Sequence, residues 1–161
     1  MSPDRIARAR TLALIVPTAL LAGAYGFQYI GHLYPCEMCW WQRYPHIAAI
    51  VFALLAFAVP ARAGRVLIVC AALAVFVSGA IGVYHAGVEY HWWEGFTACT
   101  TTMAGHGGSV DDMLARIMKA PVVRCDVPQW TAFGISLAGF NALVSIPAAM
   151  VILALLPKGR R

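Results

Sequence analysis

Charged residues are scarce in this chain of 161 residues, because Asp, Glu, Lys and Arg together make up 12% of it, about half of the roughly 25% that soluble domains carry. Hydrophobic residues make up 61%, which is more apolar surface than a core of this size can bury. Disordered proteins need the opposite balance. The net charge of +5 includes no dense basic tract, so we expect an integral membrane protein that binds no nucleic acid.

Four apolar stretches approach the ~20 residues that a helix needs to cross the hydrocarbon core of a membrane. Their approximate bounds are 11–33, 44–59, 66–86 and 130–156. They predict an all-α, four-helix membrane bundle that forms one domain over residues 1–161. The second stretch is the shortest, so its helix is expected to begin near residues 40–41, which places Cys39 at the membrane surface. The first could also be a cleaved signal peptide, but its apolar run continues past the small triplet at 22–24 to Leu33.

Acidic residues are almost absent from one set of polar segments. Residues 1–11, residues 61–65 and the tail after Leu156 hold eight basic residues and one acid. The two other loops, at about 34–44 and 87–129, hold four basic and six acidic residues. By the positive-inside rule, both termini are predicted to be cytoplasmic and these two loops to be exported.

The sequence has few cysteines, and four of its five lie in the predicted exported loops. Cys36 and Cys39 belong to the short loop, and Cys99 and Cys125 to the long one. Disulfides persist in extracytoplasmic compartments, so the charge pattern places an even number of cysteines where disulfides can form. Three pairings are possible and the spacing does not choose among them. Cys70 lies within a span and is expected to be a packing residue.

The motif Cys36-Glu37-Met38-Cys39 favours redox exchange, because a C-x-x-C pair can close a disulfide and lower the pKa of one thiol. A purely structural disulfide across so short a loop would stabilise little. The second pair lacks the C-x-x-C spacing typical of a zinc site. Trp40 stands where haem attachment requires histidine.

Several other residues are placed near these cysteines by the sequence. Arg43 follows Cys39 by four residues, so on a helix it would share a face with that sulfur and stabilise its thiolate. Gln28 and His85 lie near the outer ends of their spans and are candidates for a pocket, because polar side chains at that depth usually face the bundle interior. A short amphipathic helix is predicted at about 110–119, either on the membrane surface or against the span tops.

The pattern as a whole resembles the DsbB family, the bacterial inner-membrane thiol:quinone oxidoreductases. Besides the four spans, the resemblance rests on Pro35-Cys36-x-x-Cys39-x-x-x-Arg43, on Gln28 and His85, and on Cys125 shortly before Gln129-Trp130. It implies an enzyme of the bacterial inner membrane, with its active site on the periplasmic side, that generates disulfides with a quinone, ubiquinone or menaquinone, as the electron acceptor.

The resemblance also implies roles for single residues. Cys99 would be attacked by a reduced periplasmic thiol oxidant of the DsbA type, and the released Cys125 would then attack Cys36. The freed Cys39 thiolate would pass electrons to the quinone, with Arg43 stabilising negative charge. Gln28 and His85 match positions near the quinone site.

One residue departs from the family's pattern, because Glu37 puts a charge inside a motif that more often holds uncharged residues. A membrane protein whose exported cysteines bind metal or form structural disulfides is the alternative from another class. An enzyme similar to vitamin K epoxide reductase is a nearer alternative, but the second-loop cysteines and the four-span plan fit it less well.

Overall fold

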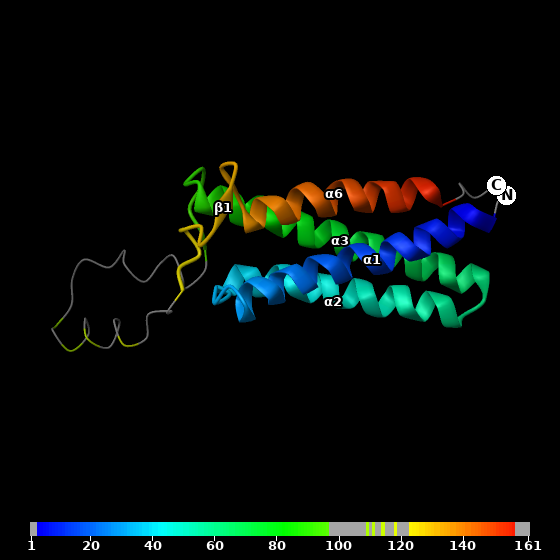
Figure 1. Ribbon diagram of the computed structural model, residues 1–161, viewed down its shortest axis with the longest axis horizontal. Helices are drawn as coiled ribbons and strands as arrows, with labels where there is room; N and C mark the ends of the chain where they lie inside the picture. The colour runs from blue at the N-terminus through cyan, green and yellow to red at the C-terminus, as the bar shows by residue number, and fades with distance from the viewer. Residues whose placement is uncertain are drawn as a thin grey trace.

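The computed structural model describes residues 3–96, 109, 111, 114, 118 and 123–156. In sequence order the elements are α1 (Pro3–Tyr29), α2 (Glu37–Ala58), α3 (Ala61–Glu89), β1 (Thr131–Ala132), β2 (Ile135–Ser136) and α6 (Leu137–Leu155). Four long helices lie side by side in one bundle (Figure 1). The predicted all-α, four-helix architecture is confirmed, whereas the helix predicted at 110–119 falls mostly outside the described residues.

The bundle has two distinct ends (Figure 1). One end carries the start of α1, the end of α6 and the short link between α2 and α3, and there Arg5 Nη2 donates a hydrogen bond to the Ala154 carbonyl at 3.0 Å. The opposite end carries the link from α1 to α2, the end of α3 and the β1–β2 hairpin. Cys36 and Cys39 of the C-x-x-C motif, at the start of α2, therefore lie at the end of the bundle opposite the start of α1 and the end of α6.

Three of the described helices are long and apolar enough to cross a membrane, over Asp4–Tyr29, Ala61–Glu89 and Leu137–Leu155. These correspond to the first, third and fourth predicted spans. α2 does not meet the same criterion, because its first half contains the polar residues Gln42, Arg43 and His46, all of them buried. α2 nevertheless packs along α1 and α3 within the bundle.

Small residues fill the middle of the bundle and large apolar ones cover its outside. The fully or almost fully buried alanines are Ala9, Ala13, Ala49, Ala53, Ala56, Ala71, Ala72 and Ala149. By contrast, side chains such as Val51, Leu73 and Leu143 are about half exposed. Close backbone approach through small residues is typical of helix packing in membranes, and the exposed apolar belt is the surface that lipid would cover.

The helix ends differ from those predicted. α2 begins at Glu37, earlier than residues 40–41, because Cys36 Sγ accepts a hydrogen bond from the Cys39 amide at 3.3 Å and so caps the helix. α1 ends at Tyr29 and not at Leu33, since His32 has a positive φ of 54° that a helix cannot contain.

The fourth helix also starts later than predicted, because residues 131–136 form the β1–β2 hairpin. Its two turn residues, Phe133 and Gly134, have φ values of 53° and 77°, as a tight two-residue hairpin requires. The Tyr90 hydroxyl donates to the Gly134 carbonyl at 2.9 Å and accepts from the Ser136 amide at 2.8 Å. Tyr90 thereby ties the end of α3 to the start of α6.

Candidate active site

Cys36 and Cys39 lie where the link from α1 enters α2. Cys36 has extended backbone, with φ −75° and ψ 177°, and Cys39 lies in the first turn of the helix. The three-residue spacing brings the two Sγ atoms to 3.0 Å, because residues three apart share one face of a helix. Both residues are free thiols here, and Cys36 is buried with 4% of its surface exposed.

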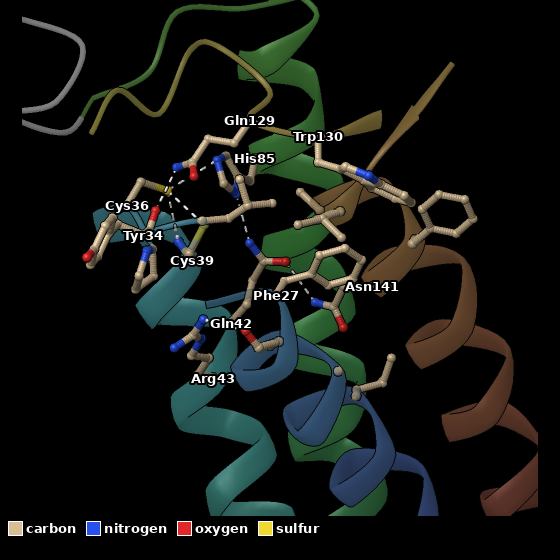
Figure 2. A pocket seen from close by; sticks show the side chains of 18 of the residues that line it. Phe27, Tyr34, Cys36, Cys39, Gln42, Arg43, His85, Gln129, Trp130 and Asn141 are labelled. Carbon is tan, nitrogen blue, oxygen red and sulfur yellow. Dashed lines mark hydrogen bonds between the residues drawn. The ribbon is translucent and has the colours of Figure 1, made fainter. Parts of the chain in front are cut away.

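Cys125 approaches the same sulfur from a distant part of the chain. Its side chain is fully buried, and the Cys36 thiol makes a side-chain hydrogen bond with it. The segment after Cys125 is held to the α1–α2 link by Gln129 Nε2, which donates to the Tyr34 carbonyl at 2.7 Å (Figure 2). Cys36 is therefore in contact with the sulfurs of both Cys39 and Cys125. Cys99, the fourth predicted redox cysteine, lies outside the described residues.

The two thiols of the motif, which precede the predicted span at 44–59, differ in acidity. The pKa of Cys36 is raised, first by its hydrogen bonds with Cys125 and Cys39 and then by burial. The pKa of Cys39 is lowered, first by the hydrogen bond from Cys36, with burial opposing it and the positive charge of Arg43 adding to it. Cys39 is thus the sulfur that more readily carries negative charge, as the sequence predicted.

Arg43 places a buried positive charge one turn further along α2. Its side chain donates to Gln28 Oε1 at 2.5 Å and to the Ala24 carbonyl at 3.2 Å, and its guanidinium lies 4.8 Å from the Tyr25 ring centroid and 5.0 Å from that of Trp40. Arg43 forms no ion pair with any of the described residues. Neutral groups therefore hold this cation in place, which leaves its charge available to an anion.

His85 and Gln28 occupy different places relative to these groups. His85, on α3, is 2% exposed, and its Nε2 lies 3.6 Å from Cys36 Sγ and 3.7 Å from Glu89 Oε1. Gln28 contacts Arg43, but it does not line the cavity beside Cys39 and Arg43 that is described below. Of the predicted pocket residues, the structure thus brings His85 to the sulfur of Cys36 and Gln28 to the guanidinium of Arg43.

The sequence reasoning missed two amide side chains that link the helices below His85. Gln42 Nε2 lies 2.8 Å from His85 Nδ1, and Asn141 Nδ2 donates to Gln42 Oε1 at 2.8 Å. Figure 2 shows Gln42 and Asn141 pointing toward each other from α2 and α6. An available signal was their polarity within apolar runs, because amides buried among membrane helices normally bond to one another.

A cavity of about 330 Å³ opens beside Cys39 and Arg43 (Figure 2). Its walls come from all four helices, the α1–α2 link and the segment after Cys125, and they include the aromatic side chains Phe27, Trp130 and Phe140. Cys36, Cys39, Arg43 and His85 also line it. A mainly apolar space with a few polar groups is typical of a small-molecule site, so the thiol pair and the cation face a space for an apolar ligand.

Comparison with known proteins decides the family. The sequence profile described as "Disulfide bond formation protein DsbB" matches residues 7–155. This chain belongs to the DsbB family. The match includes the four described helices almost completely, together with Cys36, Cys39, Cys99 and Cys125.

Two relatives of this DsbB-family chain are distant. It is 28% identical over 146 residues to "Disulfide bond formation protein B" of Marinobacter nauticus, with 82% of this chain and 80% of the relative covered. It is 23% identical over 144 residues to "Uncharacterized protein RP370" of Rickettsia prowazekii, with 89% of this chain and 83% of the relative covered. No solved structure matches. Family membership makes disulfide bond formation the general activity and fits the three membrane-capable helices.

Proposed function

We propose that this chain is a thiol:quinone oxidoreductase that reoxidises a DsbA-like periplasmic dithiol protein. The observation that carries the proposal is the position of Cys36, whose sulfur lies 3.0 Å from Cys39 Sγ and is hydrogen-bonded to Cys125, beside a cavity that contains Arg43. One sulfur can thus form a disulfide with either neighbour. A purely structural disulfide would need one partner only.

The proposed route moves a disulfide outward and an electron pair inward. The partner's first thiolate attacks Cys99 in a Cys99–Cys125 disulfide, so that a mixed disulfide with Cys99 forms and Cys125 leaves as a thiolate. The partner's second thiol then attacks the mixed disulfide, which forms the partner's own disulfide and releases Cys99 as a thiol. Cys125 attacks Cys36, so that the Cys36–Cys125 bond forms, the Cys36–Cys39 bond breaks and Cys39 leaves as a thiolate. In total the partner loses two electrons and two protons, and the chain must pass them to an acceptor.

A quinone headgroup fits the residues beside Cys39. The cavity volume of about 330 Å³ lies within the roughly 300–1,000 Å³ of ligand sites, and its aromatic and aliphatic walls suit a flat apolar ring. Arg43 would hold an oxygen of that ring, since its guanidinium is hydrogen-bonded to the neutral Gln28 amide and Ala24 carbonyl and keeps its positive charge. When bound, the quinone supplies the acceptor for two electrons and two protons.

We further propose that all four helices cross the inner membrane, with both chain ends in the cytoplasm and the cysteines at the periplasmic face. The basic residues of 1–11, 61–65 and the tail support this orientation by the positive-inside rule. The start of α1, the end of α6 and the α2–α3 link lie at the same end of the bundle, which agrees with this orientation (Figure 1). α2 would cross with its polar half turned toward α1, α3 and α6.

Metal binding is the second candidate function, because the ligand atoms of Cys36, Cys39 and His85 lie within 4.8 Å of one another. Two thiolates and an imidazole are acceptable zinc ligands. Equilibrating the reduced chain with Zn²⁺ separates the two candidates. Tight stoichiometric zinc together with absent quinone turnover favours the metal site, whereas turnover that zinc merely inhibits favours the oxidoreductase.

The direct test supplies the purified full-length chain with a reduced thioredoxin-like protein and a soluble ubiquinone analogue. We expect the quinone absorbance to fall catalytically and one quinone to be consumed for each disulfide made. Cys36→Ala should abolish this turnover, and Cys70→Ser, in the first third of α3 and toward the end of the bundle away from the site, is the matched control that should keep it. If the wild-type chain turns over no quinone with several dithiol proteins and with both ubiquinone and menaquinone analogues, the proposal is wrong.

A further inference from the structure

The two missed amides have orientations that the backbone fixes. Gln42 Nε2 donates to the Met38 carbonyl at 3.2 Å, and Asn141 Nδ2 donates to the Ser78 carbonyl at 3.1 Å. A carbonyl oxygen can only accept a hydrogen bond. Turning either amide over would place its own oxygen against that carbonyl, so the nitrogen and oxygen positions of both side chains are determined.

These orientations fix the tautomer of His85. Both hydrogens of Gln42 Nε2 are used, one on the Met38 carbonyl and the other on His85 Nδ1 at 2.8 Å. His85 Nδ1 must therefore be an acceptor. In a neutral imidazole the other nitrogen then carries the hydrogen. The Nε2–H of His85 lies among three acceptors: Cys36 Sγ at 3.6 Å, Glu89 Oε1 at 3.7 Å and the backbone of Cys125, with which the ring is hydrogen-bonded.

Asn141, on α6, holds Gln42 in this orientation. Asn141 Nδ2 donates to Gln42 Oε1 at 2.8 Å, and Asn141 Oδ1 accepts from Ser145 Oγ at 2.8 Å. The Ser78 hydroxyl donates to the backbone carbonyl of Gln42 at 2.8 Å. The network joins α2, α3 and α6, and its members Gln42, His85 and Ser78 are buried, so the bonds to Asn141 and His85 restrict the Gln42 amide.

We propose that Gln42 is a positioning residue, which with Asn141 holds His85 as the Nε2–H tautomer so that this N–H hydrogen-bonds to the sulfur of Cys36. The inference rests on the proposed function and adds to it the group that assists exchange at the shared sulfur. His85 thereby acts on a cysteine, in addition to lining the cavity where the sequence placed it.

The chemical consequence lies in the exchange step. As Cys125 attacks Cys36, the Cys36–Cys125 bond forms, the Cys36–Cys39 bond breaks, and negative charge passes from the Cys125 sulfur to the Cys39 sulfur. The central sulfur carries part of that charge during the step, and a neutral N–H donor beside it stabilises the charge without giving up its proton. The opposite tautomer would point a lone pair at the same sulfur and oppose the step.

The first measurement reads the tautomer directly and needs no turnover. In the full-length chain labelled with ¹⁵N-histidine in detergent micelles, ring ¹⁵N signals of His85 are assigned by their loss in His85→Gln. We expect Nδ1 without a hydrogen and Nε2 with one. Finding the hydrogen on Nδ1 would overturn the proposal, even if quinone turnover of the wild-type chain is normal.

The second measurement couples Gln42 to His85 in the exchange step. In a Cys99→Ser background, exchange between the Cys36–Cys39 and Cys36–Cys125 pairings is started by a jump from acid to neutral pH, quenched by alkylation and followed by peptide mass. Gln42→Met should slow it about tenfold, the low end of the effect of a hydrogen bond to a charged group, and should add almost nothing in a His85→Phe background.

Ser145→Ala is the matched control, since it removes a buried hydrogen bond at the far end of the network while the Ser78 carbonyl still orients Asn141. We expect it to leave both the ring signals and the exchange rate unchanged. Equal slowing by Gln42→Met with and without His85 would assign Gln42 a structural role only and would overturn the proposal. The wild-type ring signals decide the tautomer if Gln42→Met does not fold.

Discussion

The substitution Gly82→Ala tests how the close approach of α3 and α6 supports the site. A Cβ atom at Gly82 would lie 2.9 Å from the Ala138 carbonyl oxygen, 3.2 Å from the Ala142 amide nitrogen and 3.2 Å from Asn141 Nδ2. Two of these neighbours are backbone and cannot rotate away. We therefore expect α6 to be displaced by several tenths of an ångström, and the hydrogen bonds that Asn141 makes to α2 and α3 to lengthen.

The expected cost follows from two opposing effects. Overpacking of a tight contact destabilises by about 1–3 kcal/mol, and replacing glycine by alanine inside a helix returns about 0.5–1 kcal/mol. The net loss of unfolding free energy is roughly 0–2.5 kcal/mol, centred on about 1 kcal/mol, and a chain of this size loses about 2–4 °C of Tm for each kcal/mol. Thermal unfolding of the full-length chain in detergent measures it.

Gly26→Ala is the matched control on α1, because a Cβ atom there meets nothing within 4 Å. This variant should gain the stability that alanine adds over glycine in a helix, without any steric clash, and should leave Tm unchanged or slightly higher. The two variants thus differ in sign. Equal Tm values for Gly82→Ala and Gly26→Ala would refute the claim that backbone contact between α3 and α6 limits the space at residue 82.

Three further outcomes are expected. Arg43→Met should lower quinone turnover at least about tenfold, chiefly through kcat/KM, because the cavity loses its buried cation; steady-state kinetics with varied quinone measure this. Cys39→Ala should abolish quinone reduction and Cys70→Ser should not, in the same assay. Arg124 holds the pKa of Asp126 below its usual range. The ionised Asp126 therefore stabilises the fold at pH values above its ordinary pKa, and this stabilisation is lost as the pH falls through the depressed pKa. Asp126→Asn should remove this part of the acid dependence of Tm, and the change should be small because Arg124 is more than half exposed.

Each of these has its own control. Arg43→Lys keeps the positive charge but loses the bidentate donor geometry of the guanidinium, and it should retain more turnover than Arg43→Met. Lower turnover in Arg43→Lys than in Arg43→Met would contradict an electrostatic role for Arg43. Loss of turnover in a folded Cys70→Ser chain would contradict the packing role of that cysteine. An Asp126→Asn chain with the wild-type acid dependence would show that other carboxylates account for it.

Sequence reasoning found the features that depend on composition and short spacing. Apolar runs indicated the four helices, three of which are long and apolar enough to cross a membrane. A three-residue spacing at a helix start is enough to bring the sulfurs of Cys36 and Cys39 together. The four-residue spacing to Arg43 likewise indicated that Cys39 is the sulfur with the lowered pKa, although the hydrogen bond from Cys36 lowers that pKa more than the charge of Arg43 does. These relations are local, so the backbone geometry of one helix determines them.

What sequence reasoning missed depends on contacts between distant segments. Nothing local marks residues 131–136 as a hairpin, since the apolar pattern of 130–156 continues through them and Phe133 takes a positive φ that its side chain disfavours. Gln42 and Asn141 acquire their roles only when α2 meets α6. The capping of α2 by a cysteine was also missed, because sulfur is a weaker and less usual acceptor than the oxygen of serine or aspartate.

The contact of Cys36 with two other sulfurs has a consequence set by valence. A sulfur in a disulfide bonds to one other sulfur only, so Cys39 and Cys125 can never both be joined to Cys36. The arrival of Cys125 at Cys36 and the release of Cys39 are therefore a single event, and the released sulfur appears one helical turn from Arg43, beside the cavity. In the proposed route, each disulfide sent outward would therefore be matched, one for one, by a thiolate at the place where the proposed electron acceptor would bind.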